Sequence, residues 1–141
     1  MEKTVSVNEP LDWDELVVAL RAELREKHDL LCLLNQQTEA LYRRDLQETH
    51  QLEEQIRKQT ELAAQGRRAT ELLFHSIAVR LQLPDGALNE TILAQFPPYV
   101  QPFLESLRLE VDTLSSRLGS RILQNQDLKA RLLTSPSVKT S

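Results

Sequence analysis

Three long stretches of this chain place apolar residues at alternating intervals of three and four positions, and this spacing constrains the fold more than any other feature. In the first stretch the polar positions on this pattern are Lys27 and Thr38. Its apolar members are Trp13, Val17, Leu20, Leu24, Leu31, Leu34 and Leu41. Because an α-helix has 3.6 residues per turn, the spacing gathers them into one narrow stripe. The chain is therefore expected to pack helices along one another.

Two further stretches repeat the pattern. The last one carries it on Leu104, Leu107, Val111, Leu114 and Leu118. The middle one carries Leu52, Ile56, Ala63, Leu73 and Ile77, with Thr49, Gln59, Gly66 and Thr70 between them. Glycine in a helix interior costs about 1 kcal/mol relative to alanine. Gly66 is therefore predicted to mark a kink or a close contact with another backbone.

Residues with helix-capping side chains set the predicted starts of the first two helices. Asp12 with Glu15 forms a capping box, and Leu11 with Leu16 forms a hydrophobic staple, so the first helix is predicted over 13–42. Asp45 with Glu48 offers a second capping arrangement. Neither Gly nor Pro marks the junction at 42–45, so a turn and an unbroken helix both remain open, and we favour a turn followed by a helix over 45–81.

Turn and proline signals follow the second helix. Pro84-Asp85-Gly86 predicts a turn, and Asn89 is the expected N-cap of a short helix over 90–95. Pro97 and Pro98 end that helix, and Pro102 suits the first turn of a last helix over 102–133. The predicted fold is all-α: an elongated antiparallel bundle or coiled coil of three long helices with one short connecting helix. Residues 12–133 form the helical domain, and 1–11 and 134–141 are expected to be flexible.

Composition and charge narrow the classes of partner. The formal net charge of -4 gives no reason to expect nucleic-acid binding. No apolar run approaches the roughly 20 residues that span a bilayer, and the N-terminal decapeptide lacks the pattern of a signal peptide. We therefore expect a cytoplasmic protein without membrane insertion.

Residues able to perform chemistry are scattered. His28, His50 and His75 are far apart, and only His28 and Cys32 share helical spacing, so neither a metal site nor a cofactor is expected. Cys32 lies among leucines and is expected to be a buried or half-buried apolar thiol.

The carboxylates alternate with basic residues on the helices, as expected of a solvated surface. Pairs with four-residue spacing are Glu23 with Lys27, Glu53 with Arg57, and Glu54 with Lys58. Because no acid–base pair, nucleophile or phosphate-binding loop is recognisable, we expect a protein that is not an enzyme.

The end of the last helix is apolar on more than one face. Beyond Leu118 the stripe continues through Arg121 and Asn125 to two leucines, while Ile122, Leu123 and Leu133 lie off this line. Either the first two helices cover this surface completely, or a partner helix docks on it. The predicted partner-binding residues are Leu118, Ile122, Asn125, Leu128 and Leu132.

The order of these segments resembles the flagellar export chaperones of the FlgN type over residues 12–133. The resemblance rests on Ala40-Leu41-Tyr42-Arg43-Arg44-Asp45 at the helix junction, Leu81-Gln82-Leu83-Pro84, and Leu88-Asn89-Glu90-Thr91-Ile92-Leu93. A proline-bearing break and a leucine-rich last helix that contains Asn125 and ends in Leu132-Leu133 complete it.

This resemblance implies an all-helical cytoplasmic chaperone. Such a protein binds helical terminal segments of hook-filament junction proteins, prevents their premature assembly, and delivers them to the flagellar type III export apparatus, with export-gate components as a second partner. We expect a monomer or weak homodimer. The alternative is a structural, homo-oligomeric coiled coil without an export client, in which Lys27 or Thr38 sets the register.

Overall fold

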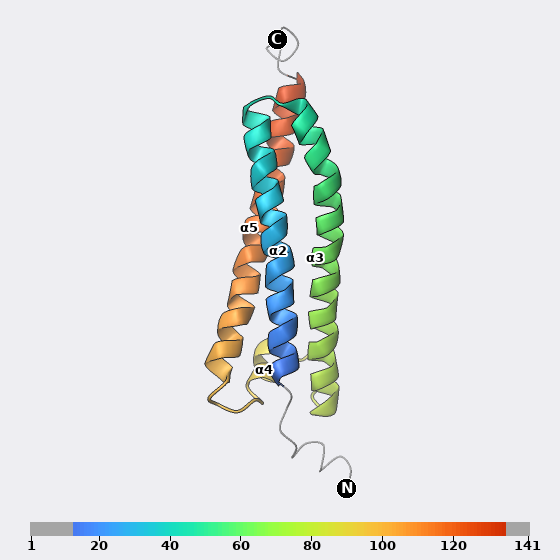
Figure 1. The fold of residues 1–141 in the computed structure, drawn as a ribbon. Helices are drawn as coiled ribbons and strands as arrows, with labels where there is room; N and C mark the ends of the chain where they lie inside the picture. The colour runs from blue at the N-terminus through green and yellow to red at the C-terminus, as the bar shows by residue number, and fades with distance from the viewer. Residues whose placement is uncertain (1–12, 135–141) are drawn as a thin grey trace. The chain divides into compact units, whose positions relative to one another are not determined.

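A computed structural model describes residues 13–134 as an all-α bundle of three long helices and one short helix (Figure 1). The helices are α2 (Trp13–Tyr42), α3 (Leu46–Arg80), α4 (Asn89–Leu93) and α5 (Gln101–Thr134). Each long helix begins and ends within one residue of its predicted limits. The flexible segment predicted at 1–11 lies outside the described residues, as does most of the predicted tail, although Thr134 belongs to α5.

The predicted N-cap is confirmed for α3 and wrong for α4. The backbone N–H of Glu48 donates to Oδ1 of Asp45 at 3.0 Å, which confirms the cap before α3. The prediction that Asn89 is the N-cap of the short helix was wrong. Leu88 takes the N-cap position because its carbonyl accepts the first helical bond from Ile92, and Asn89 is the first residue of α4. The cap predicted at Asp12 lies outside the described residues.

Helices α2 and α3 end in the same hydrogen-bonded motif without glycine. Arg44 and Gln82 adopt left-handed backbone conformations, with φ of 57° and 58°. At the end of α2, the Arg44 N–H donates to Leu41 O and the Asp45 N–H donates to Ala40 O, which is the Schellman pattern. The favoured turn between α2 and α3 is therefore present. The turn predicted at 84–86 is present too, with Gly86 at φ 80°.

The described residues divide into two compact units. The α4 unit comprises 13–24 and 65–111, and the hairpin unit comprises 25–64 and 112–134. In the hairpin unit the turn reverses the chain, so α3 runs antiparallel to α2, while α5 runs in the same direction as α2 (Figure 1).

The α4 unit has an apolar core to which all four helices and the connection between α4 and α5 contribute. Its buried members are Leu16, Val17, Leu20, Phe74, Ile77, Ile92, Leu93, Phe96, Val100, Leu104, Leu107 and Val111. Gly66 provides the predicted close contact, because a Cβ built at this position would lie 3.5 Å from the Cα of Glu23. A methyl group at this position would therefore make ordinary van der Waals contact with the backbone of α2.

The core of the hairpin unit mixes apolar and polar side chains. Its buried apolar residues are Leu30, Leu31, Leu34, Ala40, Leu41, Leu52, Ala63, Leu114 and Leu118. Its buried polar residues are Lys27, Gln37, Thr38, Thr49 and Asn125. The amide of Gln59 joins α3 to α2 by donating to Glu26 at its backbone O (2.9 Å) and at Oε1 (2.8 Å). The apolar stripes predicted from the sequence are thus confirmed as inward faces. Of their polar members, Lys27, Thr38, Thr49, Thr70 and Asn125 are buried, whereas Gln59 and Arg121 are half-buried.

Candidate functional site

The predicted partner-binding residues lie along the inward face of α5 in the hairpin unit. Leu118 and Asn125 are buried, with 6% and 3% of their surface exposed. Ile122, Leu128 and Leu132 are half-buried. Among the described residues of α5 after Leu118, none with an apolar side chain is fully buried. The other two helices therefore cover this end of α5 only in part.

A buried hydrogen-bond cluster around Asn125 holds this part of α5 against α2. Its Nδ2 donates to the backbone O of Leu34 at 2.9 Å and to Oε1 of Gln37 at 3.0 Å. Its Oδ1 lies 2.6 Å from the hydroxyl of Thr38, which donates to it. The orientation of the amide follows from these partners, because the reversed amide would turn its oxygen toward two other oxygens. Asn125 thus fixes the register of α5 along α2.

The Thr38 hydroxyl also lies 2.9 Å from the Leu34 carbonyl, within its own helix. A hydroxyl has one proton, so Thr38 shares it between the Asn125 Oδ1 and the Leu34 carbonyl. The sequence pattern had identified Thr38 and Asn125 as polar positions in two different stripes, but it gave no sign of Gln37. One polar residue in each of two apolar stripes is the signal that a pair of this kind leaves in a sequence.

One more contact joins the end of α5 to another helix. Lys129 Nζ forms an ion pair with Oε2 of Glu53 on α3. Both side chains are partly exposed, and an ion pair of this kind contributes about 0.2–1 kcal/mol. The outer face of the same segment carries two exposed leucines, Leu123 (67%) and Leu133 (58%). The segment therefore exposes two apolar side chains in addition to its half-buried inner face.

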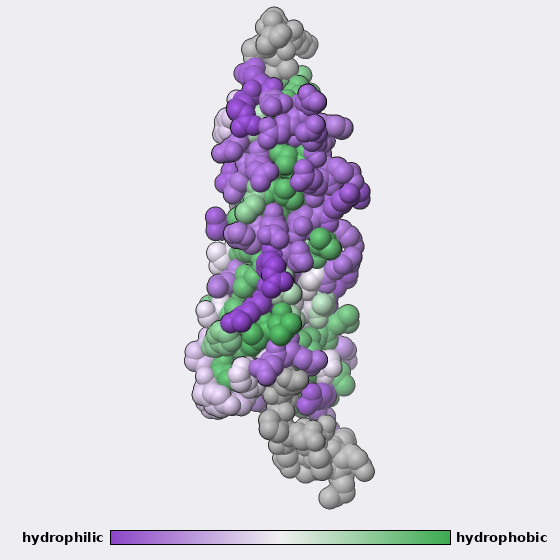
Figure 2. Space-filling view, viewed as in Figure 1, coloured by the Kyte–Doolittle hydropathy of each residue, from purple (hydrophilic) through white to green (hydrophobic). Residues whose placement is uncertain are grey.

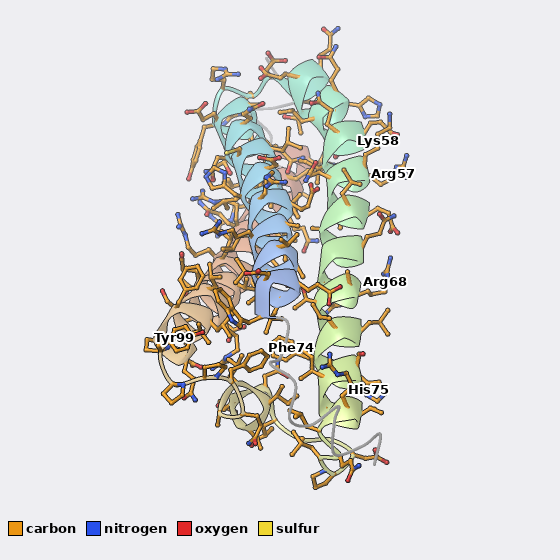
Figure 3. All side chains as sticks on the ribbon, turned by 60° about the horizontal axis from the view of Figure 1, so that its bottom comes forward. Arg57, Lys58, Arg68, Phe74, His75 and Tyr99 are labelled. Carbon is orange, nitrogen blue, oxygen red and sulfur yellow. The ribbon has the colours of Figure 1, made fainter. Side chains whose placement is uncertain are left out.

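One predicted charge pair on α3, Glu53 with Arg57, differs in the structure. Arg57 bonds to Glu54, with Nη2 2.5 Å from Oε2, instead of pairing with Glu53. The hydrogen bond from Arg57 lowers the pKa of the Glu54 carboxyl, and the same bond raises the pKa of the Arg57 guanidinium. Arg57 and its neighbour Lys58 project from the outer side of α3 (Figure 3). The cause of the different pairing is that Glu53 faces α5, where it meets Lys129.

Cys32 is exposed, so the prediction of a buried or half-buried thiol was wrong. The leucines beside it in the sequence turn inward, whereas Cys32 follows the outer face of α2 with His28, whose Nδ1 lies 3.9 Å from the sulfur. Across residues 13–134, no group of three or more His, Cys, Asp or Glu side chains is arranged to hold a metal ion. Within the same range, no helix has the length and apolar character needed to cross a membrane.

The α4 unit contains a cleft of about 330 Å³ at the end of α3. Phe74 and Ile92 contribute buried apolar surface to it, and Glu71, His75 and Asp85 contribute polar groups. Phe74 points toward the interior of the unit, whereas His75 lies on the outer side of α3 (Figure 3).

Comparison of the chain with protein-family models, curated proteins and solved structures found no match.

Proposed function

We propose that this protein is a cytoplasmic export chaperone of the FlgN type. It binds helical terminal segments of hook-filament junction proteins, keeps them from assembling early, and delivers them to the flagellar type III export apparatus and its gate components. Support comes from the order of the junction, connector and last-helix motifs in the sequence. The observation that carries the proposal is the partly covered, two-sided apolar surface of α5 after Leu118.

The contacts that hold residues 119–134 in place are mostly polar. Apolar burial stabilises by about 25 cal/mol per Å² removed from water, and this segment buries no apolar side chain fully. Its anchors are the Asn125 cluster and the ion pair of Lys129 with Glu53. Segments with few buried apolar contacts open locally at lower free energy than the core. The free-energy cost of opening the inner face of this end of α5 to a partner is therefore small.

A client helix would supply the apolar contacts that residues 119–134 lack. By lying along α5, its apolar stripe covers Leu128 and Leu132 and reaches Leu123 or Leu133 on the outer side. The same contact hides the client's own heptad stripe, which would otherwise pair with other unassembled subunits. Asn125 keeps α5 in register with α2 while Leu128 and Leu132 contact the client helix.

The test is a mass measurement of mixtures by size-exclusion chromatography with light scattering. The wild-type chain is mixed with C-terminal fragments of hook-filament junction proteins, and a complex of defined mass is expected. Leu128→Ser with Leu132→Ser should abolish the complex while circular dichroism shows retained helicity. The matched control, Leu88→Ser with Leu109→Ser, changes two exposed leucines of the α4 unit and should leave affinity unchanged. Equal affinity of all three proteins would sink the assignment.

The structural coiled coil is the second candidate, and the exposed Leu123 and Leu133 favour it, since a second copy can cover them. It predicts a mass that rises with protein concentration to a defined homo-oligomer and does not change when any fragment is added. The chaperone proposal predicts a monomer or weak dimer that converts to the client complex.

A further inference from the structure

A second apolar surface lies in the α4 unit, where α2 and α3 border an open groove of about 730 Å³. The residues that line it are Asp14, Glu15, Val18, Ala19, Ala69, Leu72, Leu73 and Ser76. On the face shown in Figure 2, apolar side chains form patches among hydrophilic ones. None of the groove residues belongs to the predicted partner-binding set.

The groove has a raised apolar rim and a low floor. Val18 on α2 is 68% exposed and Leu72 on α3 is 69% exposed, so neither side chain serves the core of the unit. Ala19, Ala69 and Ser76 have small side chains that allow another backbone to come close. Two projecting apolar side chains with small residues between them form the shape that receives the apolar stripe of a helix.

The size of the groove favours a short helix over a second copy of the chain. Eight residues line it, whereas a stable interface between proteins uses about 20–30 residues on each side. The lining residues span 14–19 on α2 and 69–76 on α3, which at 1.5 Å per residue is roughly 8–11 Å of helix. This length matches about two turns of an occupant helix.

The charges of the groove indicate the sequence of that helix. Asp14 and Glu15 lie at one end, in the first turn of α2, and no Lys or Arg is among the described residues that line the groove. A basic side chain of the occupant is therefore favoured at this end. Cations suit the C-terminal end of a helix, so the occupant that satisfies both conditions runs antiparallel to α2.

We propose that this groove docks a short amphipathic helix of a partner protein, with apolar residues at i, i+3 and i+7 and Lys or Arg at its C-terminal end. The proposal is independent of the client surface, because it uses no residue of the hairpin unit. Its failure would leave the client surface on α5 unchanged.

The test uses the full chain and a fluorescently labelled 15-residue helical peptide with Leu at i, i+3 and i+7 and two Lys at its C-terminal end. Fluorescence anisotropy should show saturable binding to the wild type. Val18→Ser with Leu72→Ser should weaken it by about tenfold or more, because two apolar contacts are lost. The matched control Leu109→Ser, whose side chain is 52% exposed on α5, should stay within about twofold. Asp14→Asn should reduce both the affinity and its dependence on salt.

Three results would overturn this assignment. The first is no saturable binding of the peptide to the wild type. The second is equal binding to the wild type and to the Val18→Ser, Leu72→Ser double variant. The third is a doubling of mass in light scattering that the same double variant removes, because a second copy would then occupy the groove.

Discussion

Replacement of Asn125 by alanine should destabilise the protein by about 2 kcal/mol. The change removes two hydrogen bonds donated by the amide and one accepted by it. The Thr38 hydroxyl keeps the Leu34 carbonyl as a partner, so the main loss is at the buried Oε1 of Gln37 and in the packing of the amide. An unsatisfied buried polar group costs about 1–3 kcal/mol. The higher helix propensity of alanine offsets about 0.5 kcal/mol of this cost.

The assay is urea denaturation followed by circular dichroism, on the wild type, Asn125→Ala, Thr38→Val and the double variant. The two residues share a hydrogen bond, so their coupling energy should be about 0.5–3 kcal/mol. The control is Gln126→Ala, which changes an exposed neighbour on the same helix and should alter the free energy of unfolding by less than about 0.5 kcal/mol. If Asn125→Ala behaves like this control, or if the coupling is zero, the cluster does not anchor α5.

Changes at three other positions test the backbone and the surface. Gly66→Ala should stabilise the protein by up to about 1 kcal/mol in calorimetry, because its Cβ would make ordinary contact with Glu23. Gly66→Leu should destabilise it by about 1–3 kcal/mol, because the larger side chain has no room there. The reverse order of stability would contradict the close approach of α3 to α2. Arg44→Gly should raise the free energy of unfolding by about 1 kcal/mol in urea, because glycine adopts a φ of 57° without strain; a loss of stability would refute this. The pKa of Glu54 is lowered in the fold by Arg57, so this pair stabilises above the ordinary carboxyl pKa and the effect disappears as pH falls through the lowered value. An NMR titration of Arg57→Gln should show the Glu54 pKa rising, and an unchanged pKa would exclude the pair in solution.

Hydrophobic spacing was sufficient to predict the three long helices and the faces that they bury. It left the junction after α2 open because the left-handed positions there and after α3 are occupied by Arg44 and Gln82, not by glycine. The core contributions of Phe96 and Val100 were missed for a different reason. They lie in a short connection without helical periodicity, and only the folded arrangement shows that they pack into the α4 unit.

The sequence predicts which face of α5 carries the candidate site, but not how deeply its residues are buried. The sequence placed Leu118 and Asn125 on one stripe of the last helix, but how deeply each is buried depends on the distance to α2 and α3. The groove at Val18 and Leu72 could not be read from either helix alone. Val18 and Leu72 each lie beside the apolar stripe of their own helix. They form one surface only because α2 and α3 border the same groove.

Hydrogen exchange of the backbone amides in α5, with and without a bound client fragment, tests whether residues 119–134 form the client-binding surface. In the free protein, residues 119–134 should exchange faster than 104–118, because their apolar side chains are only partly covered. Addition of a hook-filament junction fragment should slow exchange in 119–134 and leave 104–111 unchanged. Equal protection along α5 in the free protein, with no change in 119–134 when the fragment binds, would contradict the account.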